Sequence, residues 1–300
     1  MFSDPSTAIG KFAGTRRRYM NGTASAPAAG TILNALATGT GGAFAIGHET
    51  TATVELTTDG DVTGEIVDAP AADTGLVERC VELVIENYGD EQGGRVTTES
   101  DVPMGAGLKS SSAAANAAVL ATLDALDRHI SREDALEIGI RAARDIGVTI
   151  TGCAAGARAS MFGGVVVADN TTNELLGRGD AAWDVLVWMP PEPAFSADAN
   201  GERCERIAPM ADLAADLALD GVYERAMTVN GFAFCAALDF PTDPLLDALP
   251  HVDGVSLSGS GSSYAAVGKA DELRKVQNAW DDYEGNTWLT RTRTDGARMG

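Results

Sequence analysis

The sequence lacks several features that would place a protein in a membrane, in an oxidising compartment or around a metal ion. No apolar run reaches the roughly 18 residues that a transmembrane helix needs, and residues 1–21 show no signal-peptide pattern. The four cysteines form no C-x-x-C pair and the three histidines are scattered, which disfavours a zinc site or a disulfide framework. We interpret the cysteines as small core residues and expect a cytoplasmic protein with no membrane partner.

Basic residues are also scarce. The chain has 43 acidic residues against 22 basic ones, a formal net charge of -21. Such a balance repels phosphate backbones, so nucleic acid is not expected as a partner. Only four of the basic residues are lysines, whereas 26 of the acidic residues are aspartates. We hypothesise that this composition, which looks haloarchaeal, is an adaptation to a salt-rich cytoplasm.

Apolar residues, in contrast, are plentiful enough for a substantial core. Of the 300 residues 45% are hydrophobic, which suffices for one large domain or two lobes. The mixed order of strand and helix patterns predicts an α+β fold in two lobes, residues 20–170 and 171–300, with the boundary in the polar loop at 169–173. Residues 1–19 are expected to be a disordered tail or an upstream extension.

The hydrophobic periodicity predicts most elements individually. We expect a short helix over 31–37, and we expect Asp59-Gly60 to turn the chain into a hairpin between the strand at 51–56 and the next at 62–67. Helices are predicted at 75–88, from 111 onward, at 132–146, 210–219, 222–237 and 271–283. Further strands are predicted at 43–47, 95–100, 165–168, 184–189, 255–257, 264–267 and 287–290.

The segment 103–112 has the composition of a phosphate-binding loop. Gly105 and Gly107 allow the backbone to approach a ligand, and the serines that follow begin a helix whose N-terminus favours anions. Lys109 adds a point charge for phosphate oxygens. The segment is not a Walker A loop, because Leu108 stands where that motif has glycine. An ordinary glycine-rich turn before an alanine-rich helix is the alternative.

A second glycine-rich turn, Ser-Gly-Ser-Gly-Ser-Ser, occupies residues 258–263. Glycine–serine turns are common, so on its own this turn says little about function. Together with the first loop it is a plausible second wall of a nucleotide site.

These motifs together resemble those of the GHMP kinases. Pro-x-Gly-x-Gly-Leu-x-Ser-Ser before an alanine-rich helix is similar to their second motif, and the turn at 258–263 is similar to their third. Lys109 in place of the usual glycine, together with residues 24–31, 148–152 and 162–167, resembles the archaeal shikimate kinase branch. The resemblance covers about residues 20–294.

The resemblance implies a GHMP kinase fold with an S5-like, ATP-binding N-terminal lobe and a ferredoxin-like C-terminal lobe. It implies ATP and Mg²⁺ as cofactors, and phosphorylation of the shikimate 3-hydroxyl on the path to chorismate. Lys109 would be catalytic, Ser111 would ligate Mg²⁺, and Ser25 would lie near the acceptor. The residues expected to bind ATP are Pro103, Met104, Gly105, Ala106, Gly107, Leu108, Lys109, Ser110, Ser111, Gly259, Ser260 and Gly261.

The sequence departs from the family at the position of the proposed base. Where the family has two aspartates, this chain has Ala155 and Gly156, and the nearest carboxylates in sequence are Asp145 and Asp169. Loss of a general base costs about 10²–10⁴ in rate. The alternatives are therefore an ATP-binding relative with impaired catalysis, another GHMP kinase of the homoserine or mevalonate type, or a protein without ATP binding.

The acceptor's carboxylate would need a cation, because carboxylates pair well with arginine forks. Arg141, Arg144 and Arg158 are candidates for this role.

The salt hypothesis predicts that the purified protein loses structure when it is dialysed out of molar KCl, because its acidic surface then repels itself without screening. Circular dichroism before and after dialysis measures this loss. A chain that keeps its full stability without salt would refute the hypothesis.

Overall fold

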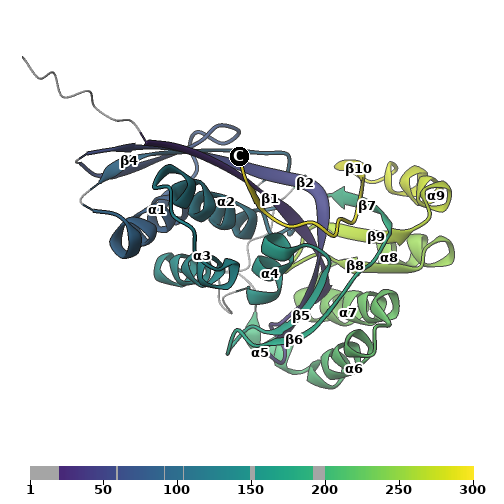
Figure 1. The fold of residues 1–300 in the computed structure, drawn as a ribbon. Coiled ribbons are helices and arrows are strands. Elements are labelled where there is room, and N and C mark those ends of the chain that lie inside the picture. The colour runs from purple at the N-terminus through teal and green to yellow at the C-terminus, as the bar shows by residue number, and fades with distance from the viewer. Residues whose placement is uncertain (1–19, 59, 91, 104, 149–152, 192–199) are drawn as a thin grey trace, which may run out of the picture.

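Two β-sheets with helices beside them make up the fold (Figure 1). The structure is a computed structural model that describes residues 20–58, 60–90, 92–103, 105–148, 153–191 and 200–300. The expected tail at 1–19 lies outside these residues. Within the described part of the chain, none of the helices has the length and apolar character that spanning a bilayer requires.

The first sheet has seven strands, ordered β11-β1-β2-β4-β3, with β5 beside β2 and β6 beside β5. Strand β2 is long enough to pair with β4 through its second half and with β5 through its first half. Its inward residues Ala52, Val54 and Leu56 are buried and alternate with more exposed ones, which is the pattern of a strand with one covered face. The strands are β1 (Met20–Leu33), β2 (Thr40–Thr57), β3 (Val62–Ile66), β4 (Gly93–Ser100), β5 (Val165–Asp169), β6 (Leu175–Gly179) and β11 (Arg298–Met299).

Four helices pack with this sheet: α1 (Gly75–Tyr88), α2 (Ser110–Ala125), α3 (Arg132–Ile146) and α4 (Ala154–Phe162). Helix α2 is buried almost all round, because its alanines let β1, α1 and α3 approach closely. Helix α3 begins and ends on local signals. The Ser131 side chain accepts a hydrogen bond from the Asp134 amide, and Gly147 ends the helix in the left-handed conformation.

The second sheet has four antiparallel strands in the order β10-β7-β9-β8. Its strands are β7 (Asp184–Met189), β8 (Gly254–Leu257), β9 (Tyr264–Gly268) and β10 (Asn286–Arg291). The helices of this half are α5 (Gly201–Glu205), α6 (Ala208–Leu219), α7 (Tyr223–Leu238), α8 (Asp243–Ala248) and α9 (Ala270–Trp280), with a 3₁₀ turn, η2 (Leu249–His251). A core cluster that includes Phe44, Leu108 and Val187 joins the two sheets.

Two local predictions are wrong. Residues 31–33 continue strand β1 instead of starting a helix, because Thr31 and Leu33 pair with Ala43 and Gly42 of β2. The hairpin after β2 does not form, since β4 lies between β2 and β3 and pairs with β3 in parallel. The segments predicted as strands at 43–47 and 51–56 are parts of the single strand β2. Asp59 lies outside the described residues.

The other predicted elements are present with boundaries shifted by a few residues, and helices 75–88 and 132–146 match in full. Elements that the sequence patterns did not indicate are β1, β6, β11, α4, α5, α8 and the 3₁₀ turn η2. The division of the chain at residue 170 stays a prediction. The first sheet includes β6 and β11, which both come after that residue.

The end of the chain is tied to β2 by Glu49. Its carboxylate accepts hydrogen bonds from Arg293 at 2.9 Å and from both terminal nitrogens of Arg298 at 2.7 and 2.9 Å. Burial by itself raises the pKa of Glu49, but the hydrogen bonds from Arg298 and Arg293 outweigh burial and lower this pKa below its ordinary value. The folded state therefore prefers the ionised carboxylate.

We predict that Glu49→Gln lowers the free energy of unfolding by about 1 kcal/mol at neutral pH, because two guanidinium groups lose their anion. A depressed pKa contributes stability that is complete above the ordinary carboxyl pKa of 4.5 and is lost as the pH falls below it. The difference between the two proteins should therefore shrink in acid. Denaturant unfolding at several pH values tests this, and equal stabilities at neutral pH would contradict it.

Candidate functional site

The glycine loop has the backbone geometry of an anion site. Gly105 and Gly107 have positive φ values of 73° and 68°, and Lys109 is left-handed with φ 58° just before α2. Lys109 is the N-cap of α2. The first backbone hydrogen bond of the helix runs from the Ala113 amide to the Lys109 carbonyl at 3.1 Å. The amides of Ser110, Ser111 and Ser112 therefore belong to the first turn, where N–H groups have no partner within the helix. A negative ligand would be stabilised there.

The loop is fixed by its apolar residues, which alternate with the glycines. Ala106 and Leu108 are each 1% exposed and belong to the core between the two sheets. The carbonyl of Leu108 also accepts a hydrogen bond from the Ala29 amide of β1 at 3.0 Å. The side chains of these two residues are therefore not available to a ligand. Pro103 is exposed, and Met104 lies outside the described residues.

The two glycine turns, far apart in sequence, touch in the structure. The Ser258 hydroxyl donates to the carbonyl oxygen of Gly107 at 3.0 Å. A β-carbon built on Gly107 would lie 2.3 Å from the carbonyl oxygen of Ser258, so no other residue fits there without movement. The structure thus brings together the two motifs that the sequence suggested as opposite walls of one site.

The end of β1 holds the second turn in place. The Gly259 amide donates to the Thr31 hydroxyl at 2.8 Å, and the Asn34 amide group donates to the Gly259 carbonyl at 2.8 Å. Asn34 itself is fixed by Asn230 of α7, whose side-chain oxygen accepts from the Asn34 backbone amide at 2.8 Å. The turn is therefore anchored to both halves of the molecule.

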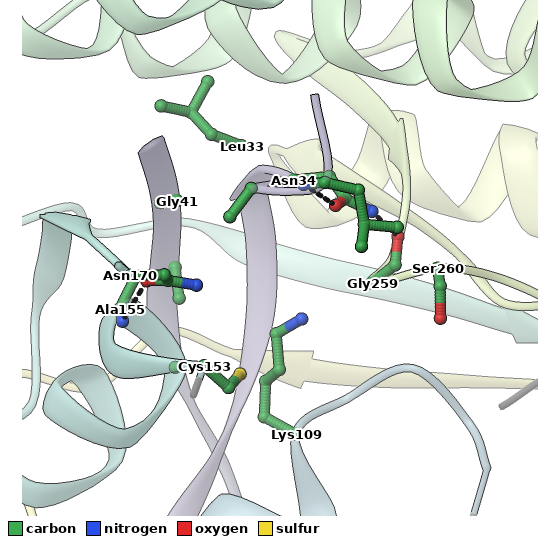
Figure 2. Close-up of a pocket in the computed structure, with 14 residues that line it drawn as sticks. Leu33, Asn34, Gly41, Lys109, Cys153, Ala155, Asn170, Gly259 and Ser260 are labelled. Carbon is green, nitrogen blue, oxygen red and sulfur yellow. Dashed lines mark hydrogen bonds between the residues drawn. The ribbon is translucent and has the colours of Figure 1, made fainter. Parts of the chain in front are cut away.

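A pocket opens where the two turns meet (Figure 2). The end of β1, the start of β2, the first turn of α4 and both glycine turns contribute to it. Of the described residues that line it, Lys109 alone carries a charge, and Figure 2 shows its side chain extending into the pocket beside Cys153. The lining residues are Leu33, Asn34, Ala35, Leu36, Gly41, Gly42, Ala43, Lys109, Cys153, Ala155, Gly156, Asn170, Gly259 and Ser260.

Asn170, in the turn after β5, joins three parts of the pocket wall. Its side-chain oxygen accepts a hydrogen bond from the backbone amide of Ala155 at 3.0 Å, and this bond caps the first turn of α4. The backbone amide of Asn170 donates to the Gly39 carbonyl at 2.9 Å. Asn170 is buried, with 5% of its surface exposed. It lies against Gly41, where a β-carbon would come within 3.0 Å of the Asn170 oxygen.

The position expected to hold a catalytic base does line the pocket, but without a carboxylate. Ala155 and Gly156 form the start of α4. Asp145 is paired with Arg79 at 3.0 Å, away from the pocket lining. The pKa of Asp169 is lowered by hydrogen bonds from the backbone amides of Thr172 and Thr171, and this residue does not line the pocket either.

Several residues proposed for the acceptor are placed elsewhere. Ser25 pairs with Thr51 and Arg298 within the first sheet and is not part of the pocket lining. Arg158 is buried against Glu133 at 2.6 Å, and Arg144 binds the Asn173 side chain at 2.9 Å. Arg141 is exposed and lies near Asp145. None of these arginines is a lining residue.

Sequence reasoning missed the pocket residues from the end of β1 and the start of β2, and also Cys153 and Asn170. No local motif marks them. Asn34 stands alone between Leu33 and Ala35, and Asn170 is one of several polar residues in the loop at 169–173. The glycines at 39, 41 and 42 were the one available signal, since a cluster of this kind often marks a close approach of the backbone.

The described part of the chain offers few side chains near the pocket that could bind a metal ion. Among the described residues no group of three or more His, Cys, Asp or Glu side chains could hold a metal ion. Ser111 is exposed at the second position of α2, so its hydroxyl remains a candidate ligand for an ion that arrives with phosphate.

Comparisons with known proteins agree with this geometry. The model of the GHMP kinases N terminal domain matches residues 75–164, which run from α1 through α4. A homoserine kinase from Cytophaga hutchinsonii superposes with a TM-score of 0.75 at 17% identity, covering 95% of this chain and 99% of that one. The fold is therefore that of the GHMP kinases.

Two curated relatives narrow the assignment. The shikimate kinase of Halobacterium salinarum is 57% identical over 93% of this chain and 99% of its own length. The shikimate kinase of Methanosarcina mazei is 48% identical over 93% of this chain and 96% of its own. The chain belongs to the archaeal-type shikimate kinase family.

We predict that Lys109→Gly abolishes most catalysis without lowering stability. The substitution removes the pocket's cation, yet it also relieves a left-handed backbone that costs a non-glycine residue about 1–2 kcal/mol. The melting temperature should therefore stay level or rise while product formation falls. A fall in both quantities would mean that Lys109 is mainly a structural residue.

Proposed function

We propose that this chain transfers the terminal phosphoryl group of ATP to shikimate, giving shikimate 3-phosphate. The observation that supports the proposal is the contact between the two glycine turns, beside a pocket whose described lining has one cation, Lys109. The identity to shikimate kinases over nearly the whole chain supports the choice of acceptor.

The loop fits the nucleotide. Gly107 has no room for a side chain beside Ser258, so backbone amides rather than side chains would face the phosphates. When bound, ATP supplies the phosphoryl group, and Mg²⁺ would neutralise part of its charge. We propose the backbone of residues 103–111 and of 259–261 as the ATP-binding surface, with the Ser111 hydroxyl as the chain's ligand to Mg²⁺.

The pocket suits a small anionic acceptor with several hydroxyl groups. Shikimate carries one carboxylate and three hydroxyls on a six-membered ring. Among the lining residues, Lys109 provides a cation, and Asn34 and Asn170 provide amides. A carboxylate on the wall would repel such a ligand, and none stands among the described lining residues.

Lys109 is the residue that we propose as catalytic. Phosphoryl transfer depends mostly on positioning and on charge stabilisation. An ammonium group directed into the pocket beside the phosphate loop can stabilise the charge on the transferred group. Neither Ala155 nor Gly156 has a carboxylate that could take the proton from the acceptor hydroxyl. This favours either a mechanism without a protein base or an ATP-binding protein with impaired catalysis.

A kinase assay in molar KCl decides between these functions. The unaltered chain receives ATP and Mg²⁺ with shikimate, homoserine or mevalonate, and mass spectrometry detects the phosphorylated product directly. We expect shikimate 3-phosphate, at many turnovers per chain, and no product from the other two acceptors.

Two other outcomes would overturn the proposal in different ways. Product from homoserine or mevalonate alone would assign another acceptor. No product, together with the stabilisation of about 2.7 kcal/mol that a ligand gives at 100 times its dissociation constant, would identify an ATP-binding protein without this chemistry.

A further inference from the structure

Gly156, in the first turn of α4, lies directly against the side chain of Lys109. A β-carbon built on Gly156 would lie 3.1 Å from both Cγ and Cδ of Lys109 and 2.9 Å from Sγ of Cys153. Distances in this range are shorter than ordinary van der Waals contacts between carbon atoms. The aliphatic part of Lys109 therefore uses the space that any other residue at 156 would fill.

The far end of Lys109 reaches the second glycine turn. Its Nζ atom lies 3.4 Å from the position that a β-carbon on Gly259 would take. The side chain thus begins in the phosphate loop, crosses the start of α4, and ends beside Gly259 (Figure 2). Three separate segments of the chain define its path.

Both the backbone of Lys109 and helix α4 are held in place by neighbouring residues. The backbone of Lys109 is fixed by its left-handed conformation and by the start of α2. Helix α4 is held by the bond from the Ala155 amide to Asn170, and by buried Arg158, which binds Glu133 and the Asn173 carbonyl. A side chain at 156 would therefore push Lys109 aside rather than move the helix.

We propose that Gly156 is a positioning residue, which keeps the ammonium group of Lys109 between the two glycine turns. The inference rests on the proposed function, in which that ammonium group is catalytic. It also gives a physical reason for the missing carboxylate, because an aspartate at 156 and an extended Lys109 compete for the same space. The site holds a cation there and excludes an anion.

The test is a double-mutant cycle between Gly156→Ala and Lys109→Gly. Gly139→Ala serves as the matched control, because Gly139 lies inside helix α3 and a β-carbon there would come no closer than 3.6 Å to another atom. Each variant is assayed for kcat and for both KM values with ATP and shikimate, and each is melted without ligand.

We expect Gly156→Ala to lower kcat by about 10–100-fold, the effect of displacing a reacting group by about 1 Å, with little change in the KM for ATP. In the Lys109→Gly background the same substitution should change kcat by less than about twofold. The melting temperature should fall by about 2–4 °C with Lys109 present. It should fall by less without Lys109, because only the close contact with Cys153 then remains. Gly139→Ala should leave kcat unchanged.

An equal loss of kcat in both backgrounds would overturn the inference, because Gly156 would then act without Lys109. So would an equal shift of melting temperature in both, which needs no substrate to measure. Absence of turnover in the unaltered chain would instead refute the proposed function, and the melting data distinguish that result from failure of the inference.

Discussion

The contact between Gly107 and Ser258 is the interaction on which the site depends. The two residues come from turns that are 151 positions apart, and they approach so closely that one of them has to be glycine. Ala106 and Leu108 fix the first turn in the core between the sheets, while Thr31 and Asn34 fix the second. Contacts within the chain itself therefore anchor both turns, and with them the start of α2. Preorganisation of this kind is the main contribution that a protein makes to phosphoryl transfer.

Charge is the second constraint, and its sign in the pocket is opposite to that of the whole chain. A net charge of -21 surrounds a pocket whose described lining carries only Lys109. In the proposed function two anionic substrates would meet there, so a carboxylate on the wall would work against both of them. The small residues Ala155 and Gly156 thus have a consistent physical meaning: they leave space for the lysine, and they add no negative charge.

The sequence predicted the parts of the fold that local signals determine. Helix α3 follows from its periodicity, its Ser131 cap and its terminal Gly147, and the glycine loop follows from composition alone. Prediction was wrong where distant partners decide, as at 31–33, whose alanine-rich surroundings favour a helix until β2 pairs with them. Asn34 and Asn170 were missed for the same reason. Asn34 acts on a glycine 225 positions away, and no pattern within the sequence reveals such a contact.

A crystal structure of the chain with shikimate and a non-hydrolysable ATP analogue, grown in molar KCl, tests the central claim most directly. We expect the ammonium group of Lys109 to lie within a hydrogen-bond distance, about 3 Å, of the terminal phosphate, with its side chain still packed against Gly156. The shikimate ring should lie in the pocket between Gly41, Asn170 and Gly259, with no carboxylate of the protein touching its 3-hydroxyl. A lysine turned out of the pocket, or a carboxylate from another segment bound to that hydroxyl, would contradict the account.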